Sequence, residues 1–118
     1  MIRNDEHTNE YTLSAFMVNV QMENWIPTYG DVLTCCIVDD EVQVLYSRDV
    51  VGKIPRPLMA TFGNFLQCGT IHAKVAGALI NQGYGDKIPV DYIFASSIEN
   101  IKLMISEIEV PADENSTR

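Results

Sequence analysis

The stretch "DVVGKIPRPLMATFGNFLQCGTIHAKVAG", residues 49–77, contains the signals for three elements in succession. It begins with a short β-branched run, VVGKI, which ends at Pro55 because proline lacks the N–H that a strand ladder needs. Pro57 suits a first helical turn, and the apolar residues after it recur at helical spacing: Leu58, Met59, Phe62, Phe65 and Leu66. Gly69 ends that helix, and TIHAKVAG alternates as a strand does. The pattern predicts strand, helix and strand, with the helix at about 57–68.

Further strands are predicted on both sides of this unit. YTLSAFMVNVQM, residues 11–22, is rich in strand formers, but its alternation changes phase at Ala15 and Phe16, which predicts a β-bulge. DVLTCCIV and EVQVLYS flank Asp39-Asp40, a turn-prone pair that predicts a hairpin. Downstream, ALINQGYGDKI is predicted to be a Gly-rich loop and PVDYIFAS a strand. Five or six short strands with one main helix predict the α+β class, as a small, strongly bent antiparallel β-sheet or partial barrel.

The last part of the chain has helical and then polar character. Ser96 and Glu99 form a capping-box pattern, and apolar residues repeat at helical spacing to Ile108, so a second helix is predicted at about 97–108. A length of 118 residues predicts one domain. We expect it at residues 11–110, between a flexible arm at 1–10 and a disordered tail at 111–118.

Composition and charge exclude several classes of function. The net charge of −8 opposes general adhesion to nucleic acid or to anionic membranes. No apolar run approaches the ~20 residues that cross a bilayer, and the polar, acidic first ten residues lack the apolar core of a secretory signal. Cys35, Cys36 and Cys68 have no zinc-type spacing. They predict three reduced, mostly buried thiols in an intracellular protein, with a bridge from Cys68 to one of the pair as the alternative.

The positive charges gather in the middle of the chain. Only three of the sixteen acidic residues lie between positions 48 and 91, and five of the eight basic residues do: Arg48, Lys53, Arg56, Lys74 and Lys87. Because Lys and Arg neutralise phosphates, these five residues are candidates for binding a nucleic-acid backbone.

Aromatic residues in the predicted loops are candidates for contacting bases. Trp25 and Tyr29 flank Pro27 in a polar loop, where exposed rings would stack bases and buried rings would cap the end of the barrel. Tyr84, at the tip of the GYGD loop, is a further candidate. If these residues form a site, the loop that carries Trp25 and Tyr29 lies at the same end of the barrel as Lys53 and Arg56, which we expect.

A second hypothesis is a metal-dependent, DNA-cleaving nuclease or toxin. Asp39, Asp40 and Glu41 offer oxygen ligands for Mg²⁺ or another divalent cation, and His72 would assist as a general base. Turn chemistry explains the Asp39-Asp40 pair without a metal, and His72 is predicted to face outward beside Lys74. A third hypothesis is a protein–protein interaction module, monomeric or weakly dimeric, that uses an exposed strand edge.

The VVGKIPR turn, the helix closed by FLQCG, the strand TIHAKVAG and the strand IPVDYIF together resemble the HIRAN domain, most closely the stand-alone HIRAN-like proteins of invertebrates. IPTYGDVLTC is similar to the family's first strand, and the resemblance covers about residues 16–94. It implies a twisted β-barrel that captures a single-stranded DNA end, with aromatic rings stacking bases and a loop acid holding the terminal hydroxyl.

Tyr29 and Lys53 stand at positions that match this pocket. The chain departs from the family where an Asp-Pro-x-Asn-x-x-Asp loop is replaced by CIVDDEVQV. The resemblance and the local basic cluster favour a non-enzymatic domain that binds single-stranded nucleic acid without a cofactor.

Overall fold

The computed structural model describes the backbone of residues 8–23, 25–81 and 86–117, and the side chains of the same ranges as far as Ile108. Its strands are β1 (Asn9–Val18), β2 (Val32–Val38), β3 (Glu41–Tyr46), β4 (Asp49–Lys53), β5 (Thr70–Val75), β6 (Ile80–Asn81) and β7 (Asp86–Ser96). Its helices are the 3-10 turn η2 (Arg56–Leu58), α1 (Met59–Phe65) and α2 (Ile98–Thr117). The α+β class predicted from the sequence is confirmed.

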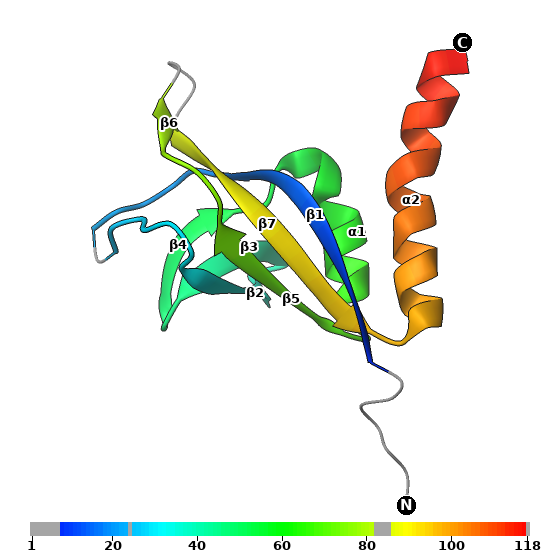
Figure 1. Ribbon diagram of the computed structural model, residues 1–118, viewed down its shortest axis with the longest axis horizontal. Coiled ribbons are helices and arrows are strands. Elements are labelled where there is room, and N and C mark those ends of the chain that lie inside the picture. Colours follow the sequence, from blue (N-terminus) through cyan, green and yellow to red (C-terminus); the bar gives the residue numbers. More distant parts are fainter. Residues whose placement is uncertain (1–7, 24, 82–85, 118) are drawn as a thin grey trace, which may run out of the picture.

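Six of the strands form a closed antiparallel barrel. The order is β1-β4-β3-β2-β5-β7, and β7 pairs with β1 to complete the circle, while β6 extends β7 as a short hairpin partner. The β1–β7 ladder is long and unbroken, from Asn9 opposite Ser96 to Val18 opposite Lys87. Between β1 and β4 the paired register is Val18 with Lys53. Strand β1 therefore pairs with β7 along its whole length and with β4 over a short stretch at Val18 (Figure 1).

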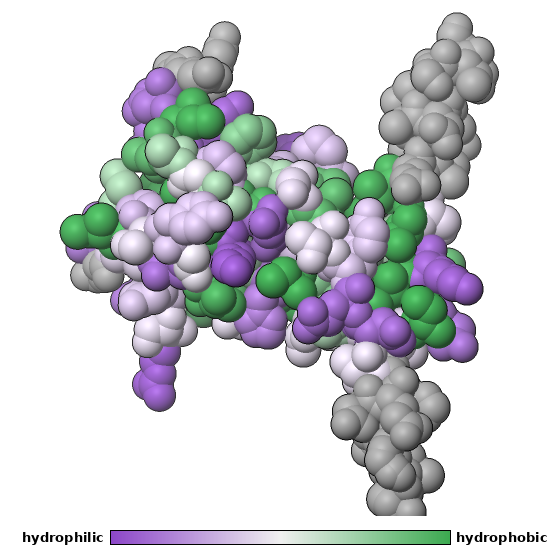
Figure 2. All heavy atoms as spheres, in the orientation of Figure 1, coloured by the Kyte–Doolittle hydropathy of each residue, from purple (hydrophilic) through white to green (hydrophobic). Residues whose placement is uncertain are grey.

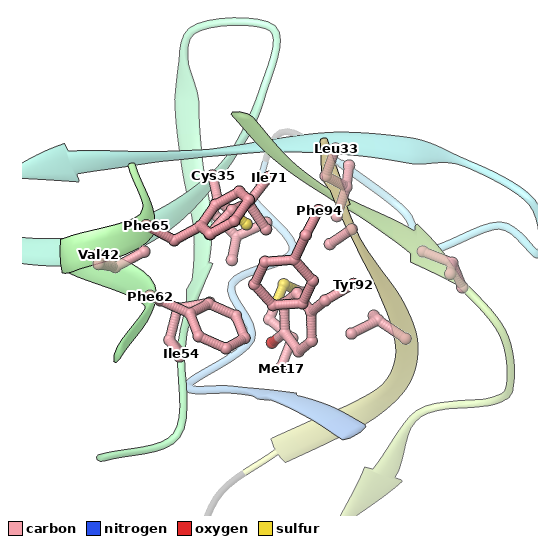
Figure 3. Close-up of a cluster of buried hydrophobic side chains, with 14 of the residues drawn as sticks. Met17, Leu33, Cys35, Val42, Ile54, Phe62, Phe65, Ile71, Tyr92 and Phe94 are labelled. Carbon is pink, nitrogen blue, oxygen red and sulfur yellow. The ribbon is translucent and has the colours of Figure 1, made fainter. Parts of the chain in front are cut away.

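Helix α1 fills the core from one side of the barrel, because its apolar stripe faces the strands. Phe62 and Phe65 are buried and point toward β7 (Figure 3). The ring of Phe62 lies 4.9 Å from that of Tyr92 and 5.0 Å from that of Phe94, both edge to face, which is a favoured geometry for aromatic pairs. Helix α2 lies beside α1 and packs on it through Ile101 and Met104 (Figure 1).

Strand β1 keeps one alternation throughout, so the predicted bulge at Ala15 and Phe16 is wrong. Inward side chains alternate with exposed ones as far as Phe16 and Met17, and the register with β7 is continuous. Phe16 faces outward, where the Lys87 ammonium lies 4.5 Å from its ring centroid. This contact explains why an aromatic residue occupies an outer position and disturbs the apolar pattern. A register shift occurs instead between Val44 and Leu45 of β3.

The turn between β2 and β3 is tight. Asp39 and Asp40 have φ of 53° and 66°, as the two central residues of a type I′ hairpin turn require, so the predicted hairpin is confirmed.

The segment predicted to be a Gly-rich loop differs, because Ile80 pairs with Lys87 and Asn81 with Asp86 in a β6–β7 hairpin. Tyr84 lies outside the described residues.

The ends of the domain also differ from the prediction. Asn9 and Glu10 belong to β1, because the long β7 offers them partners in Ser96 and Ala95, while residues 1–7 of the predicted arm lie outside the described part. The hydroxyl of Ser97, rather than that of Ser96, caps α2 by accepting the Asn100 backbone N–H at 3.2 Å. The helix continues to Thr117, through the segment predicted as a disordered tail.

Candidate nucleic-acid interface

A hollow of about 270 Å³ opens where β1 ends, β3 begins and β4 runs into η2. The residues that line it are Val18, Asn19, Glu41, Lys53, Ile54, Arg56 and Met59. Lys53 reaches this position because it ends β4 opposite Gln43, and Arg56 follows after the Ile54-Pro55 corner. The hollow thus brings together Lys53 and Arg56, two of the basic residues that the sequence predicted to act jointly.

Among the described residues that line the hollow, the acid is Glu41, and it is already paired. The Lys53 ammonium lies 3.1 Å from the Glu41 carboxylate, and both side chains are partly exposed. The hydrogen bond from Lys53, followed by its charge, holds the pKa of Glu41 below its ordinary value, and the charge of Arg56 adds a smaller effect. Glu41 is therefore an ion-pair partner here, and the guanidinium of exposed Arg56 leaves the hollow with surplus positive charge.

A third basic residue, Lys87, lies two strands from Lys53, on the other side of β1. Val18 pairs directly with Lys53 on β4 and with Lys87 on β7, and directly paired residues share one face of a sheet. Lys87 in turn covers Phe16, whose side chain is 36% exposed. Phe16 is not among the site residues predicted from the sequence, although its two-residue spacing from Val18 places both on one face of β1.

Of the two aromatic residues in the loop before β2, Trp25 is buried and Tyr29 is exposed. Trp25 is 5% exposed, and its indole N–H donates a hydrogen bond to Asp31 Oδ2 at 3.1 Å. The prediction that Trp25 stacks bases is therefore wrong, and the alternative of a ring that caps the barrel end is confirmed. Tyr29 is 78% exposed, as a contact residue needs.

The loop that carries these aromatics lies at the other end of the β3–β4 hairpin from Lys53, contrary to expectation. The Trp25 ring packs 6.0 Å from that of Tyr46 at the end of β3, whereas Lys53 binds Glu41 at its start. Five residues of extended strand separate these points, which is about 17 Å. Exposed Arg48, on the β3–β4 turn, belongs to the Tyr46 end as well. One nucleotide cannot span both groups.

The proposed metal-dependent nuclease site does not form. Among the residues that the structure describes, no three His, Cys, Asp or Glu side chains are placed to hold a metal ion. Asp39 and Asp40 form the β2–β3 turn, and Glu41 is paired with Lys53. His72 faces outward on β5 as predicted, but it is level with Thr34, about 13 Å along β2 from the turn. Exposed Lys74 lies farther away still, opposite Val32.

The three cysteines are free thiols, as the sequence predicted, and the alternative of a Cys68 bridge is wrong. Cys35 and Cys36 point to opposite faces of β2, so Cys35 is buried and Cys36 half-buried. Burial raises the pKa of the Cys35 thiol to about 12, with a smaller contribution from Cys36. Cys68 is exposed in the turn after α1, which corrects the expectation of mostly buried thiols.

Comparisons of the chain with family models, with curated proteins and with solved structures found no match. In the described part of the chain, none of the helices has the length and apolar character needed to span a membrane.

Proposed function

We propose that this protein is a non-enzymatic domain that binds single-stranded nucleic acid on one outer face of its barrel. The face consists of Lys53, Arg56, Lys87 and Phe16, and we call it the cationic face. The observation that carries the proposal is the convergence of three cations beside an exposed aromatic ring and a hollow of about 270 Å³. The resemblance of the VVGKIPR turn to the HIRAN domain supports the same function, because Lys53 lies in that turn.

The spacing of these groups suits a single strand. Lys53 on β4 and Lys87 on β7 both pair with Val18 on β1, which lies between them. Their Cα atoms are therefore separated by two strand spacings, roughly 10 Å. Successive phosphates of an extended single strand lie roughly 6–7 Å apart, so neighbouring nucleotides can reach both ammonium groups. Phe16, two residues before Val18, then offers a ring for a base, and such stacking is worth ~1–3 kcal/mol.

The charge balance predicts weak binding that depends strongly on salt. Each phosphate neutralised on a single strand contributes about 0.7 to the slope of log K against log salt concentration, so three cations give a slope of about −2. The net charge of −8 and the carboxylate of Glu41 both oppose the approach of phosphates. We expect binding to be measurable at low salt and to vanish at high salt.

The test is a fluorescence-anisotropy titration of a labelled oligothymidylate at several salt concentrations. The double variant Lys53→Gln/Arg56→Gln should bind about tenfold more weakly and reduce the salt slope from about −2 to about −0.7, because two phosphate contacts are lost. The matched control is Arg48→Gln/Lys74→Gln, which removes the same charge from exposed positions away from the hollow.

The control variant should retain both the affinity and the slope within about twofold. Equal weakening by the two double variants would mean that the protein attracts nucleic acid only through its overall charge, and the proposed site would be wrong. Absence of any wild-type binding at low salt would reject the function itself.

A further inference from the structure

The loop between β1 and β2, with the end of β3 beside it, carries a concentration of exposed apolar side chains. Met22 is 43% exposed, Ile26 78%, Tyr29 78% and Tyr46 41%. We call these four residues the loop surface. In Figure 2, apolar atoms reach the left edge of the molecule, where the segment between β1 and β2 lies in Figure 1. A shallow hollow of about 520 Å³ opens there, lined by Met22, Glu23, Trp25, Ile26, Thr28, Asp31 and Tyr46.

The loop that bears this surface is fixed by its own hydrogen bonds. The Asp31 carboxylate accepts the Trp25 indole N–H at 3.1 Å and the Thr28 backbone N–H at 3.2 Å. The loop is also tied to β5, since Gly30 N–H donates to the Val75 carbonyl and Val75 N–H to the Asp31 carbonyl, each at 2.9 Å. Ile26 and Tyr29 are thus held in water on a preformed turn, which lowers the entropy cost of binding through them.

The charges around this hollow have one sign. Its charged lining residues, among those that the structure describes, are Glu23 and Asp31. Arg48 lies on the turn after Tyr46 and is not part of the lining. A partner that covers the loop surface therefore meets an apolar patch beside carboxylates, within a chain of net charge −8.

We propose that the loop surface binds a protein partner through a segment in which large apolar side chains lie next to Lys or Arg. The apolar side chains cover Ile26 and Tyr29, and the basic group approaches Glu23 and the free side of the Asp31 carboxylate. Exposed Tyr and Ile on a rigid turn have the character of binding hot spots, which need little area to dominate an interface. A second copy of this acidic chain is disfavoured as the occupant, because like charges repel.

The test uses a synthetic peptide with a Leu-Phe-Leu centre between two pairs of lysines. Amide NMR spectra of the protein, followed during titration, should shift at Met22, Glu23, residues 25–26 and 28–31, and Tyr46. The double variant Ile26→Ser/Tyr29→Ser should weaken this binding about tenfold. The matched control is Ile98→Ser/Leu103→Ser, which removes two exposed apolar side chains from α2 and should change the affinity less than about twofold.

Two further peptides test the chemistry. Replacing the lysines by glutamates, or the apolar centre by serines, should each abolish the shifts. Undiminished binding of either peptide, shifts located elsewhere, or no binding of the lysine peptide would overturn the proposal. So would a dimer, measured by sedimentation, that dissociates in the Ile26→Ser/Tyr29→Ser variant. Lys53→Gln/Arg56→Gln should leave peptide binding unchanged, so the outcome is independent of nucleic-acid binding.

Discussion

The Lys53 ammonium and the Glu41 carboxylate form an ion pair of 3.1 Å at the rim of the hollow, and the hydrogen bond within it is the main cause of the lowered pKa of Glu41. Both groups are partly exposed, so the pair contributes little to stability, and its main effect is on charge. The pair therefore favours the ionised form of Glu41 beside Lys53 and Arg56.

Removing Lys53 should therefore return the pKa of Glu41 toward its ordinary value. A lowered pKa in the folded state means that the stabilisation is present above the ordinary value, near pH 4.5, and is lost as the pH falls through the folded value. Carbon-detected NMR titration of the Glu41 carboxyl measures this directly. Lys53→Gln should move the midpoint upward, and Arg56→Gln should move it less. A larger effect from Arg56→Gln would contradict the assignment of the hydrogen bond as the main cause.

Two glycines near α1 should respond to alanine in opposite directions. Gly63 lies inside the helix, where an added Cβ would meet only Val42 Cγ2 at 3.8 Å, an ordinary contact. Gly63→Ala should raise the free energy of unfolding by about 1 kcal/mol, the usual helix preference of Ala over Gly. A Cβ at Gly69 would lie 2.5 Å from the Ala95 carbonyl oxygen, so Gly69→Ala should cost about 1–3 kcal/mol. Urea denaturation of both variants checks the prediction, and equal signs would contradict it.

The β2–β3 turn offers a test at a single position. Asp40 has φ of 66°, a conformation that glycine adopts freely and alanine avoids. Asp40→Gly should raise the free energy of unfolding by about 0.5–1 kcal/mol and so raise the midpoint temperature of thermal unfolding. Asp40→Ala should lower both. Calorimetry on the two variants gives the comparison. Destabilisation by Asp40→Gly would show that the aspartate side chain contributes more than the backbone conformation costs.

Alkaline pH should destabilise the protein through Cys35. The pKa of this thiol is raised from 9.0 to about 12 by burial, so above pH 9 the unfolded state loses a proton that the folded state keeps. The stabilisation is present below pH 9 and is lost as the pH rises toward 12, at up to about 1.4 kcal/mol per pH unit. Burial also raises the pKa of Tyr92 above its ordinary 10.0, so the Cys35 effect is best isolated between about pH 8 and pH 10.

Urea denaturation across that pH interval measures the effect. Cys35→Ala should remove most of the slope of stability against pH, although the variant starts from a lower stability because the cavity costs packing. Cys68→Ala, at an exposed position, serves as the control and should keep the slope. A wild-type slope that survives in Cys35→Ala would assign the pH dependence to other groups.

The fold could be predicted from the sequence because its boundaries have local causes. Pro57 lies in the first turn of the helical segment, and the Asp39-Asp40 pair marks a hairpin, so these features depend on neighbouring residues alone. The helix itself ends at Phe65, before the predicted stop at Gly69. The closure of the barrel depends instead on β1 pairing with β7 across most of the chain, which no local pattern encodes. The outer position of Phe16 likewise has a non-local partner, since the ring lies against Lys87 on β7.

The candidate site could be predicted only in part. Lys53 and Arg56 lie on one turn, so their proximity follows from sequence separation. Trp25 differs from its prediction because its indole N–H is bonded to Asp31, and a buried indole with a satisfied N–H has no surface left for a base. Which end of the barrel each loop occupies follows from the strand order, and that order emerges only in three dimensions.

The long β1–β7 ladder also bears on how the chain acquires its fold during synthesis. Val18 pairs with Lys87, which the ribosome adds 69 residues later, and Asn9 pairs with Ser96. At typical elongation rates of 5–20 residues per second, β1 waits about 3–14 s for its partner. The β2–β3–β4 meander can form during that interval from near neighbours, whereas β1 stays unpaired along an apolar stripe. During this interval chaperones can bind the unpaired β1 of the nascent chain, until β7 leaves the ribosome and pairs with it.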